Sequence, residues 1–199
     1  MWSGIFAARC EPANFVGRLR RLPAERAEWF SDRMTARRSG WELDLERIQG
    51  YEKAMARALR LAQQAGEAGD VPVGAVVLDE AGRVIGKGFN DREAAGNPVG
   101  HAEVNALVAA AKQRGGWRLE GCTLVVTLEP CTMCAGAVVA SRVPCLVFGA
   151  WDPKAGACGS VRDVVRDSRL NHQVEVVAGV LEHDCEFVLR RFFASRRNM

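Results

Sequence analysis

Apolar and polar positions alternate in an ordered way from about residue 48 onward. Between residues 51 and 62, apolar residues recur every three or four positions, which predicts one face of a helix, and Gly66 and Gly69 end that pattern. Two short apolar runs follow at 75–78 and 84–89, and the segment Asp-Glu-Ala-Gly lies between them. This arrangement predicts a β-hairpin after the first helix.

Helical and strand-like segments then alternate to the end of the chain. A loop is predicted over residues 90–100, which contain Gly96, Pro98 and Gly100. The predicted helices are 101–113, 131–141 and 182–197, with a short one around 161–167, and the predicted strands are 123–128, 145–148 and 174–177. Helices that alternate with strands after a hairpin indicate an α/β protein with a mixed five-stranded sheet and helices on both faces.

Residues 1–48 differ from the remainder of the chain. They are rich in Arg, Glu and Trp and have no clean strand pattern, so we predict an N-terminal extension that is poorly ordered or loosely helical, followed by a folded domain over 49–199. A translation start at Met34 is a further hypothesis, which N-terminal sequencing of protein made from the native gene would test. The first 30 residues lack a continuous apolar stretch and are a poor secretory signal, although their arginines leave a mitochondrial alternative open.

Composition limits the possible classes of protein only moderately. The net charge of +3 is too small to identify a polyanionic partner by itself. No apolar run has the length that a membrane span requires, so no membrane association is expected. The seven cysteines have no disulfide-framework spacing, which favours reduced thiols and a cytoplasmic location.

Two short segments carry the chemistry. One contains His101 and Glu103, and the other contains Cys131 and Cys134 directly after Pro130. Both segments open predicted helices, and residues three apart lie on one helix face, so both sulfurs can reach the same ion. One imidazole and two thiolates form a suitable zinc set with a coordination position left for water, as in a catalytic site.

Interpretations without a catalytic metal also remain open for these segments. The two cysteines alone also fit a redox pair or two buried thiols. A closed structural zinc site would need a fourth ligand, for which Cys122, Cys145 and Cys158 are the candidates. Helical spacing does not place Glu103 beside the metal, because positions two apart do not share a face. A carboxylate next to a zinc-bound water is nevertheless what a hydrolytic site requires.

The combination His-x-Glu with Pro-Cys-x-x-Cys resembles the signature of the zinc-dependent nucleobase deaminases. Wider stretches look like the tRNA-specific adenosine deaminase branch: 71–75, 86–90, 127–137, 149–160 and 171–172. The resemblance covers about residues 50–197. It implies a three-layer α-β-α cytidine-deaminase-like fold and a zinc-dependent deaminase domain over 49–199.

The resemblance also implies an activity, the hydrolytic deamination of adenosine to inosine at the wobble position of a tRNA anticodon. His101, Cys131 and Cys134 would hold one zinc ion per subunit of a homodimer. Glu103 would shuttle protons while a zinc-activated water attacks C6 of the adenine. Asn90 matches a residue that hydrogen-bonds the base, although it also fits a turn asparagine. Ala102 would line the base pocket, and Asp152 resembles a residue near the nucleotide before the target.

The partner implied by the resemblance is a tRNA anticodon stem-loop. The candidate phosphate contacts are Lys154, Arg190, Arg191, Arg196 and Arg197, although these arginines also fit an ordinary solvated helix face. Two departures from the family leave the range of substrates open: Pro98-Val99-Gly100 before His101, and Trp151 before Asp152. The alternatives are a deaminase of a free base or nucleotide, of the guanine, cytosine or deoxycytidylate type, and a non-catalytic zinc-stabilised scaffold.

Overall fold

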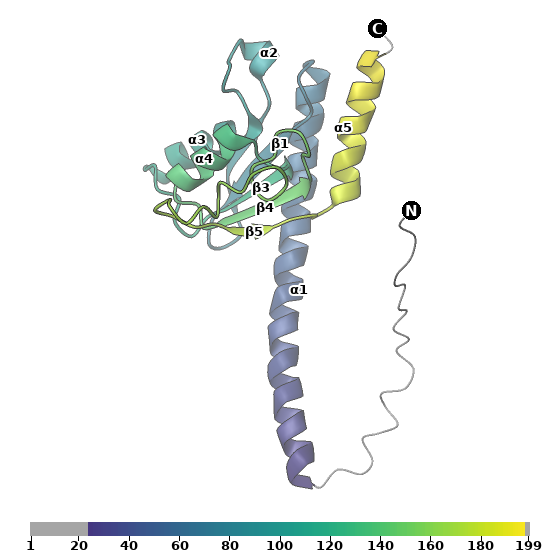
Figure 1. Cartoon of the computed structure of the whole chain (residues 1–199), viewed down its shortest axis with the longest axis vertical. Helices are drawn as coiled ribbons and strands as arrows, with labels where there is room; N and C mark the ends of the chain where they lie inside the picture. The colour runs from purple at the N-terminus through teal and green to yellow at the C-terminus, as the bar shows by residue number, and fades with distance from the viewer. Residues whose placement is uncertain (1–23, 198–199) are drawn as a thin grey trace, which may run out of the picture. The chain divides into compact units, whose positions relative to one another are not determined.

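The computed structural model describes residues 24–197, and describes side chains from residue 45 onward (Figure 1). The chain divides into two compact units, residues 1–46 and 47–199, and the sheet and the candidate site lie in the second unit. The predicted extension over residues 1–48 stays a prediction, and its residues 1–23 lie outside the described part.

Helix α1 spans Ala24–Glu67 and therefore begins well before residue 48, where the apolar pattern had placed its start. Residues 24–46 are rich in Ala, Glu and Arg, which favour a helix through their intrinsic propensity. The other end of α1 agrees with the prediction. Gly69 takes a positive φ of 89°, and the Asp70 N–H closes the last turn on the Ala65 carbonyl at 2.9 Å.

The predicted mixed five-stranded sheet is confirmed. Its strands are β1 Gly74–Leu78, β2 Val84–Phe89, β3 Thr123–Leu128, β4 Cys145–Ala150 and β5 Glu175–Val177. They are ordered β2-β1-β3-β4-β5, with antiparallel pairing on both sides of β1 and parallel pairing from β3 to β5. The hairpin thus forms one edge of the sheet, and strands β3, β4 and β5 form the parallel half.

Helices cover both faces of this sheet, which confirms the three-layer α-β-α arrangement (Figure 1). Helices α3 (Ala102–Arg114) and α4 (Thr132–Ala140) pack on one face, over alternate strand residues such as Val77, Val126 and Phe148. The part of α1 that follows residue 50 and helix α5 (Glu182–Arg197) pack on the other face, over Val76, Val125 and Val147. This alternation is the period of two expected for strands that are buried on both faces.

Two local predictions were wrong. Residues 161–167 form turns instead of a helix, because the Arg162 and Val164 N–H groups donate to the carbonyls of Gly156 and Ala157 within the same loop. The predicted loop 90–100 contains a short helix, α2 (Arg92–Ala95). In the first turn of this helix, the Glu93 and Ala94 N–H groups donate to the Asp70 carboxylate, which lies more than twenty residues earlier in the chain.

None of the helices within residues 24–197 combines the length and apolar character that crossing a membrane requires.

Candidate metal centre and active site

The three predicted zinc ligands come from the starts of two neighbouring helices. His101 is the N-cap residue of α3, and Cys131 is the N-cap residue of α4, while Cys134 lies in the first turn of α4. Both N-cap residues have extended backbones, and neither side chain caps its helix. The imidazole and the thiol therefore remain free to act as ligands beside the partially positive ends of two helices.

The ligand atoms lie at separations suited to a tetrahedral zinc ion. The His101 Nδ1 atom is 3.7 Å from the Cys131 sulfur and 3.4 Å from the Cys134 sulfur, and all three ligand atoms lie within 4.8 Å of one another. Zinc–nitrogen and zinc–sulfur bonds of ordinary length at a tetrahedral angle would separate the two ligand atoms by about 3.6 Å. The donor set and its geometry therefore both fit a zinc ion.

The candidate site has three protein ligands. Among the described side chains, no further His, Cys, Asp or Glu joins this cluster. The cysteines considered as a fourth ligand contact other groups: Cys122 contacts Arg114, Cys145 contacts Tyr51, and the Cys158 thiol faces the Pro130 carbonyl. Three ligands without a fourth correspond to a catalytic zinc site that leaves one position for water.

The pKa values of the two cysteine thiols also favour the binding of a cation. Hydrogen bonds from Cys134 and His101 lower the pKa of Cys131 to about 3, whereas the hydrogen bond with Cys131 and burial raise the pKa of Cys134. The hydrogen bond with Cys131 likewise raises the pKa of His101. Two sulfurs that share one proton can both become thiolates when a metal ion takes its place.

Glu103 lies beside these ligands, which its spacing in the sequence could not establish. Glu103 is only 4% exposed, and burial raises the pKa of its carboxyl group. Its own backbone N–H, the charge of His101 and a hydrogen bond with Cys134 partly oppose that rise in pKa. A buried carboxyl group next to an open metal position is placed to accept a proton there and to donate it again.

Asn90 and Ala102 are joined by a hydrogen bond. The buried Asn90 side-chain oxygen accepts from the Ala102 N–H at 2.9 Å, at the first residue of α3. The described residues offer no partner to the Asn90 side-chain nitrogen, which leaves a donor for a ligand. Nearby, Asn105 donates to Asp91 at 3.0 Å, and the Asp91 N–H donates to the Gly100 carbonyl. The segment before His101 is thus closed by residues to which the sequence analysis had assigned no role.

Glu129 organises the loop that follows β4. Its buried carboxylate accepts hydrogen bonds from the backbone N–H groups of Asp152, Cys158 and Ser160, each at 3.0 Å. Its own N–H donates to the Ala150 carbonyl at 2.8 Å. Since Pro130 and Cys131 come next in the chain, one residue supports both the zinc-ligand segment and the neighbouring loop.

The predicted RNA contacts only partly come together. Lys154 lies with Arg190, Arg196 and Arg197 around one hollow of about 460 Å³ between the 150–160 loop and α5. Arg190 is paired with Glu186 at 2.8 Å, and Arg196 donates to the Gly69 carbonyl. Asp152 uses one carboxylate oxygen to hold the Lys154 and Ala155 N–H groups, so it also has a local structural role.

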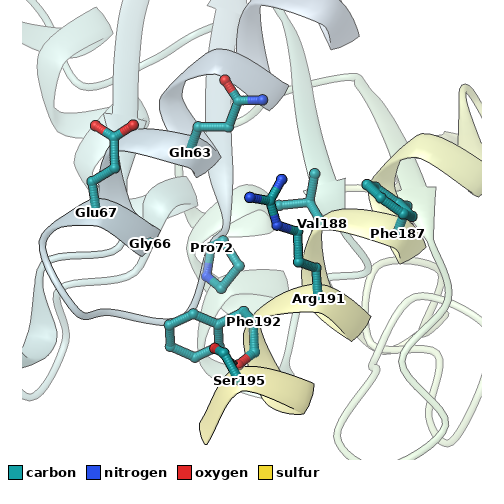
Figure 2. Close-up of a pocket in the computed structure, with 9 residues that line it drawn as sticks. All are labelled: Gln63, Gly66, Glu67, Pro72, Phe187, Val188, Arg191, Phe192 and Ser195. Carbon is teal, nitrogen blue, oxygen red and sulfur yellow. Dashed lines mark hydrogen bonds between the residues drawn. The ribbon is translucent and has the colours of Figure 1, made fainter.

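Arg191 faces a different pocket, of about 620 Å³, between α1 and α5 (Figure 2). Helix α1 contributes Gln63 and Glu67 to its wall, and α5 contributes Arg191 and Phe192. This pocket has none of the metal-ligand residues and lies between the two helices that cover the opposite face of the sheet from α3 and α4. Its size therefore does not make it the reaction site.

Comparison with known proteins agrees with this geometry. Residues 48–150 match the family described as the cytidine and deoxycytidylate deaminase zinc-binding region. The chain belongs to this family of zinc-binding deaminases, and the match includes His101, Glu103 and both cysteines of the cluster.

Within the family, this chain is similar to proteins of one kind. It is 49% identical over 146 residues to the tRNA-specific adenosine deaminase of Bacillus subtilis, which covers 73% of this chain and 90% of the relative. The same identity is found with the tRNA-specific adenosine deaminase of Haemophilus influenzae, over 73% of this chain and 84% of the relative.

Solved structures show the same fold. One from a study of A-to-I editing by tRNA:A34 deaminases at the wobble position of transfer RNA has a TM-score of 0.66 at 38% identity, covering 69% of this chain and 99% of that one. A guanine deaminase from Nitrosomonas europaea has a TM-score of 0.62 at 28% identity, covering 72% and 84%.

Proposed function

We propose that this protein deaminates adenosine to inosine at the wobble position of a tRNA anticodon, using water and releasing ammonia. The observation that carries the proposal is the open cluster of His101, Cys131 and Cys134 with the buried Glu103 beside it. The choice of adenosine in tRNA is supported by the 49% identity to the Bacillus subtilis tRNA-specific adenosine deaminase.

Each residue of the cluster has a part in this chemistry. A zinc ion held by His101, Cys131 and Cys134 would lower the pKa of a bound water and supply the nucleophile at neutral pH. With zinc bound, the Glu103 carboxylate would be placed to accept a proton from the attacking water and to return protons to the ring nitrogen and to the departing amine at C6. Asn90 donates its free side-chain N–H to the base, while its oxygen holds the start of α3 in place.

The RNA would lie over the 150–160 loop and α5. Lys154, Arg190, Arg196 and Arg197 surround one hollow there, and such a basic surface attracts the phosphates of a single-stranded loop. Arg191 is a weaker candidate, because it lines the pocket between α1 and α5. The target adenine has to leave its stack to reach the metal, as in other enzymes that react with a base.

We further propose a cytoplasmic homodimer. Val99 and Met133, near the starts of α3 and α4, are 48% and 37% exposed, which suits an apolar contact between subunits. All six cysteines with described side chains are free thiols, as expected in a reducing compartment. Light scattering should give twice the chain mass of 21.7 kDa, and cell fractionation should recover the protein in the cytosol.

The test of function is inosine formation in an anticodon stem-loop that carries the target adenosine. Free adenosine, cytidine and guanine are assayed alongside. Inosine in the stem-loop alone supports the proposal. Turnover of a free base or nucleoside alone would keep the zinc chemistry and replace the substrate, with guanine favoured by the likeness to the guanine deaminase.

A Glu103→Ala variant separates an enzyme from a zinc-stabilised scaffold. Because Glu103 is absent from the ligand cluster, the variant should retain its zinc. Its turnover should fall by about 10²–10⁴-fold, the usual contribution of a positioned acid–base group. Undiminished turnover in this variant would remove Glu103 from the mechanism, and an inactive wild type that binds zinc would favour the scaffold.

A further inference from the structure

Trp151 follows the last residue of β4 and is 41% exposed. A single exposed apolar residue is common on protein surfaces and means little by itself. This one is held firmly, however. Its ring packs edge to face on Phe148 with centroids 4.8 Å apart, and a Cβ added at Gly159 would lie 3.4 Å from the indole.

The backbone on both sides of Trp151 is fixed by Glu129. The Glu129 N–H donates to the Ala150 carbonyl at 2.8 Å, and the Asp152 N–H donates to the Glu129 carboxylate at 3.0 Å. Glu129 lies two residues before Cys131. The backbone of Cys131 pairs with that of Gly156, in the loop that follows β4, as an isolated antiparallel β-bridge. The backbone that carries the indole is therefore tied to the segment that contains Cys131.

The direction and surroundings of the ring fit a nucleic-acid ligand. Phe148, its packing partner, belongs to the core beneath α3 and α4, so the indole lies on the face of the sheet that carries the zinc ligands. Lys154, three residues later, borders the basic hollow. Rigid aromatic rings beside a basic groove are the usual stacking surfaces for unpaired bases.

We infer that Trp151 is a stacking surface for a base that flanks the target adenosine in the anticodon loop. The inference rests on the proposed function and deepens it by assigning a residue that selects the sequence around the target. An exposed, immobilised indole loses little conformational entropy when a base covers it, which makes it well suited to this contact.

The test is a double-mutant cycle between Trp151 and the RNA. Trp151→Leu keeps an apolar contact with Phe148 but offers no aromatic face, and Trp151→Phe keeps a ring. Each enzyme is assayed on the intact stem-loop and on stem-loops with an abasic site on the 5′ or the 3′ side of the target. We expect Trp151→Leu to lower kcat/KM about 5- to 150-fold on intact RNA, as for the loss of one stacked base.

On RNA that lacks the stacked base, Trp151→Leu should have less than about a twofold further effect, because that contact is already gone. Trp151→Phe should retain most of the activity. Trp117→Leu is the matched control, since Trp117 is 57% exposed but lies beyond the opposite end of α3 from His101. It should behave as wild type on every substrate.

Equal losses from Trp151→Leu on all three RNAs, or no loss at all, would overturn the inference. So would a loss accompanied by reduced zinc content or a dissociated dimer, since either would mean that Trp151 acts on the protein instead of the RNA. A wild type that produces no inosine in any stem-loop refutes the proposed function itself. Wild-type activity without coupling at either flank refutes only the role of Trp151.

Discussion

Replacing Glu129 with Gln should destabilise the protein well beyond what an isosteric change normally causes. One carboxylate oxygen accepts the Cys158 and Ser160 N–H groups, and the other accepts the Asp152 N–H. A glutamine keeps one oxygen and presents an N–H₂ group in place of the other. If its oxygen keeps the pair of donors, its nitrogen faces the Asp152 N–H, so two donors oppose each other and one backbone group loses its partner.

The cost of the Glu129→Gln change follows from these contacts. Losing one hydrogen bond to a charged group costs about 1.5–3 kcal/mol, and an unsatisfied buried donor about 1–3 kcal/mol, with overlap between the two. A total of about 2–4 kcal/mol in the free energy of unfolding would lower Tm by about 4–16 °C for a domain of this size. Zinc content and inosine formation should also fall, because Glu129 lies two residues before Cys131 and holds the same segment in place.

Calorimetry and metal analysis test this prediction. Glu120→Gln, in the exposed turn before β3, is the matched control and should leave both Tm and zinc content unchanged. A Tm for Glu129→Gln within about 1 °C of wild type, equivalent to less than about 0.5 kcal/mol, would refute the reasoning. It would mean that water or a rearranged loop satisfies the backbone N–H groups equally well.

Three further changes test other parts of the structure. Gly88→Ala should lower the free energy of unfolding, measured by chemical denaturation, by about 1–3 kcal/mol, because the added Cβ would collide with the Ala102 carbonyl at the start of α3. Gly136→Ala is the control, because a Cβ added there would have nothing within 4 Å. Removing zinc with a chelator should abolish turnover and lower Tm, and adding zinc should restore both; full activity after verified removal would contradict a zinc mechanism. Arg47→Ala should cost less than about 1 kcal/mol despite its 2.6 Å pair with Glu175, because both side chains are roughly half exposed; a larger loss would show that its hydrogen bond to Tyr51 matters more than the ion pair.

The candidate metal cluster was predictable because two short segments contain all three of its residues, each segment at the start of a helix. The mixed sheet was predictable because its strands have clear apolar runs bounded by turns. The position of Glu103 was not, since the conformation of a first helical turn depends on what packs against it. The helix predicted over 161–167 failed for a related reason: the N–H groups of Arg162 and Val164 have acceptors elsewhere in their own loop. Sequence patterns describe the preference for a helix, whereas the folded loop supplies these backbone groups with other acceptors.

Glu129 also makes the support of the candidate metal site independent of the side chains in the loop that follows β4. It bonds only to backbone N–H groups of the loop, so it does not depend on which side chains follow β4. Any residue except proline satisfies the bond at position 152, because only proline lacks the N–H group. A tryptophan at position 151 therefore changes the surface of this loop without loosening the support of Cys131. Asp152→Pro should remove one of the three donors to the Glu129 carboxylate and lower zinc affinity, which metal analysis would measure.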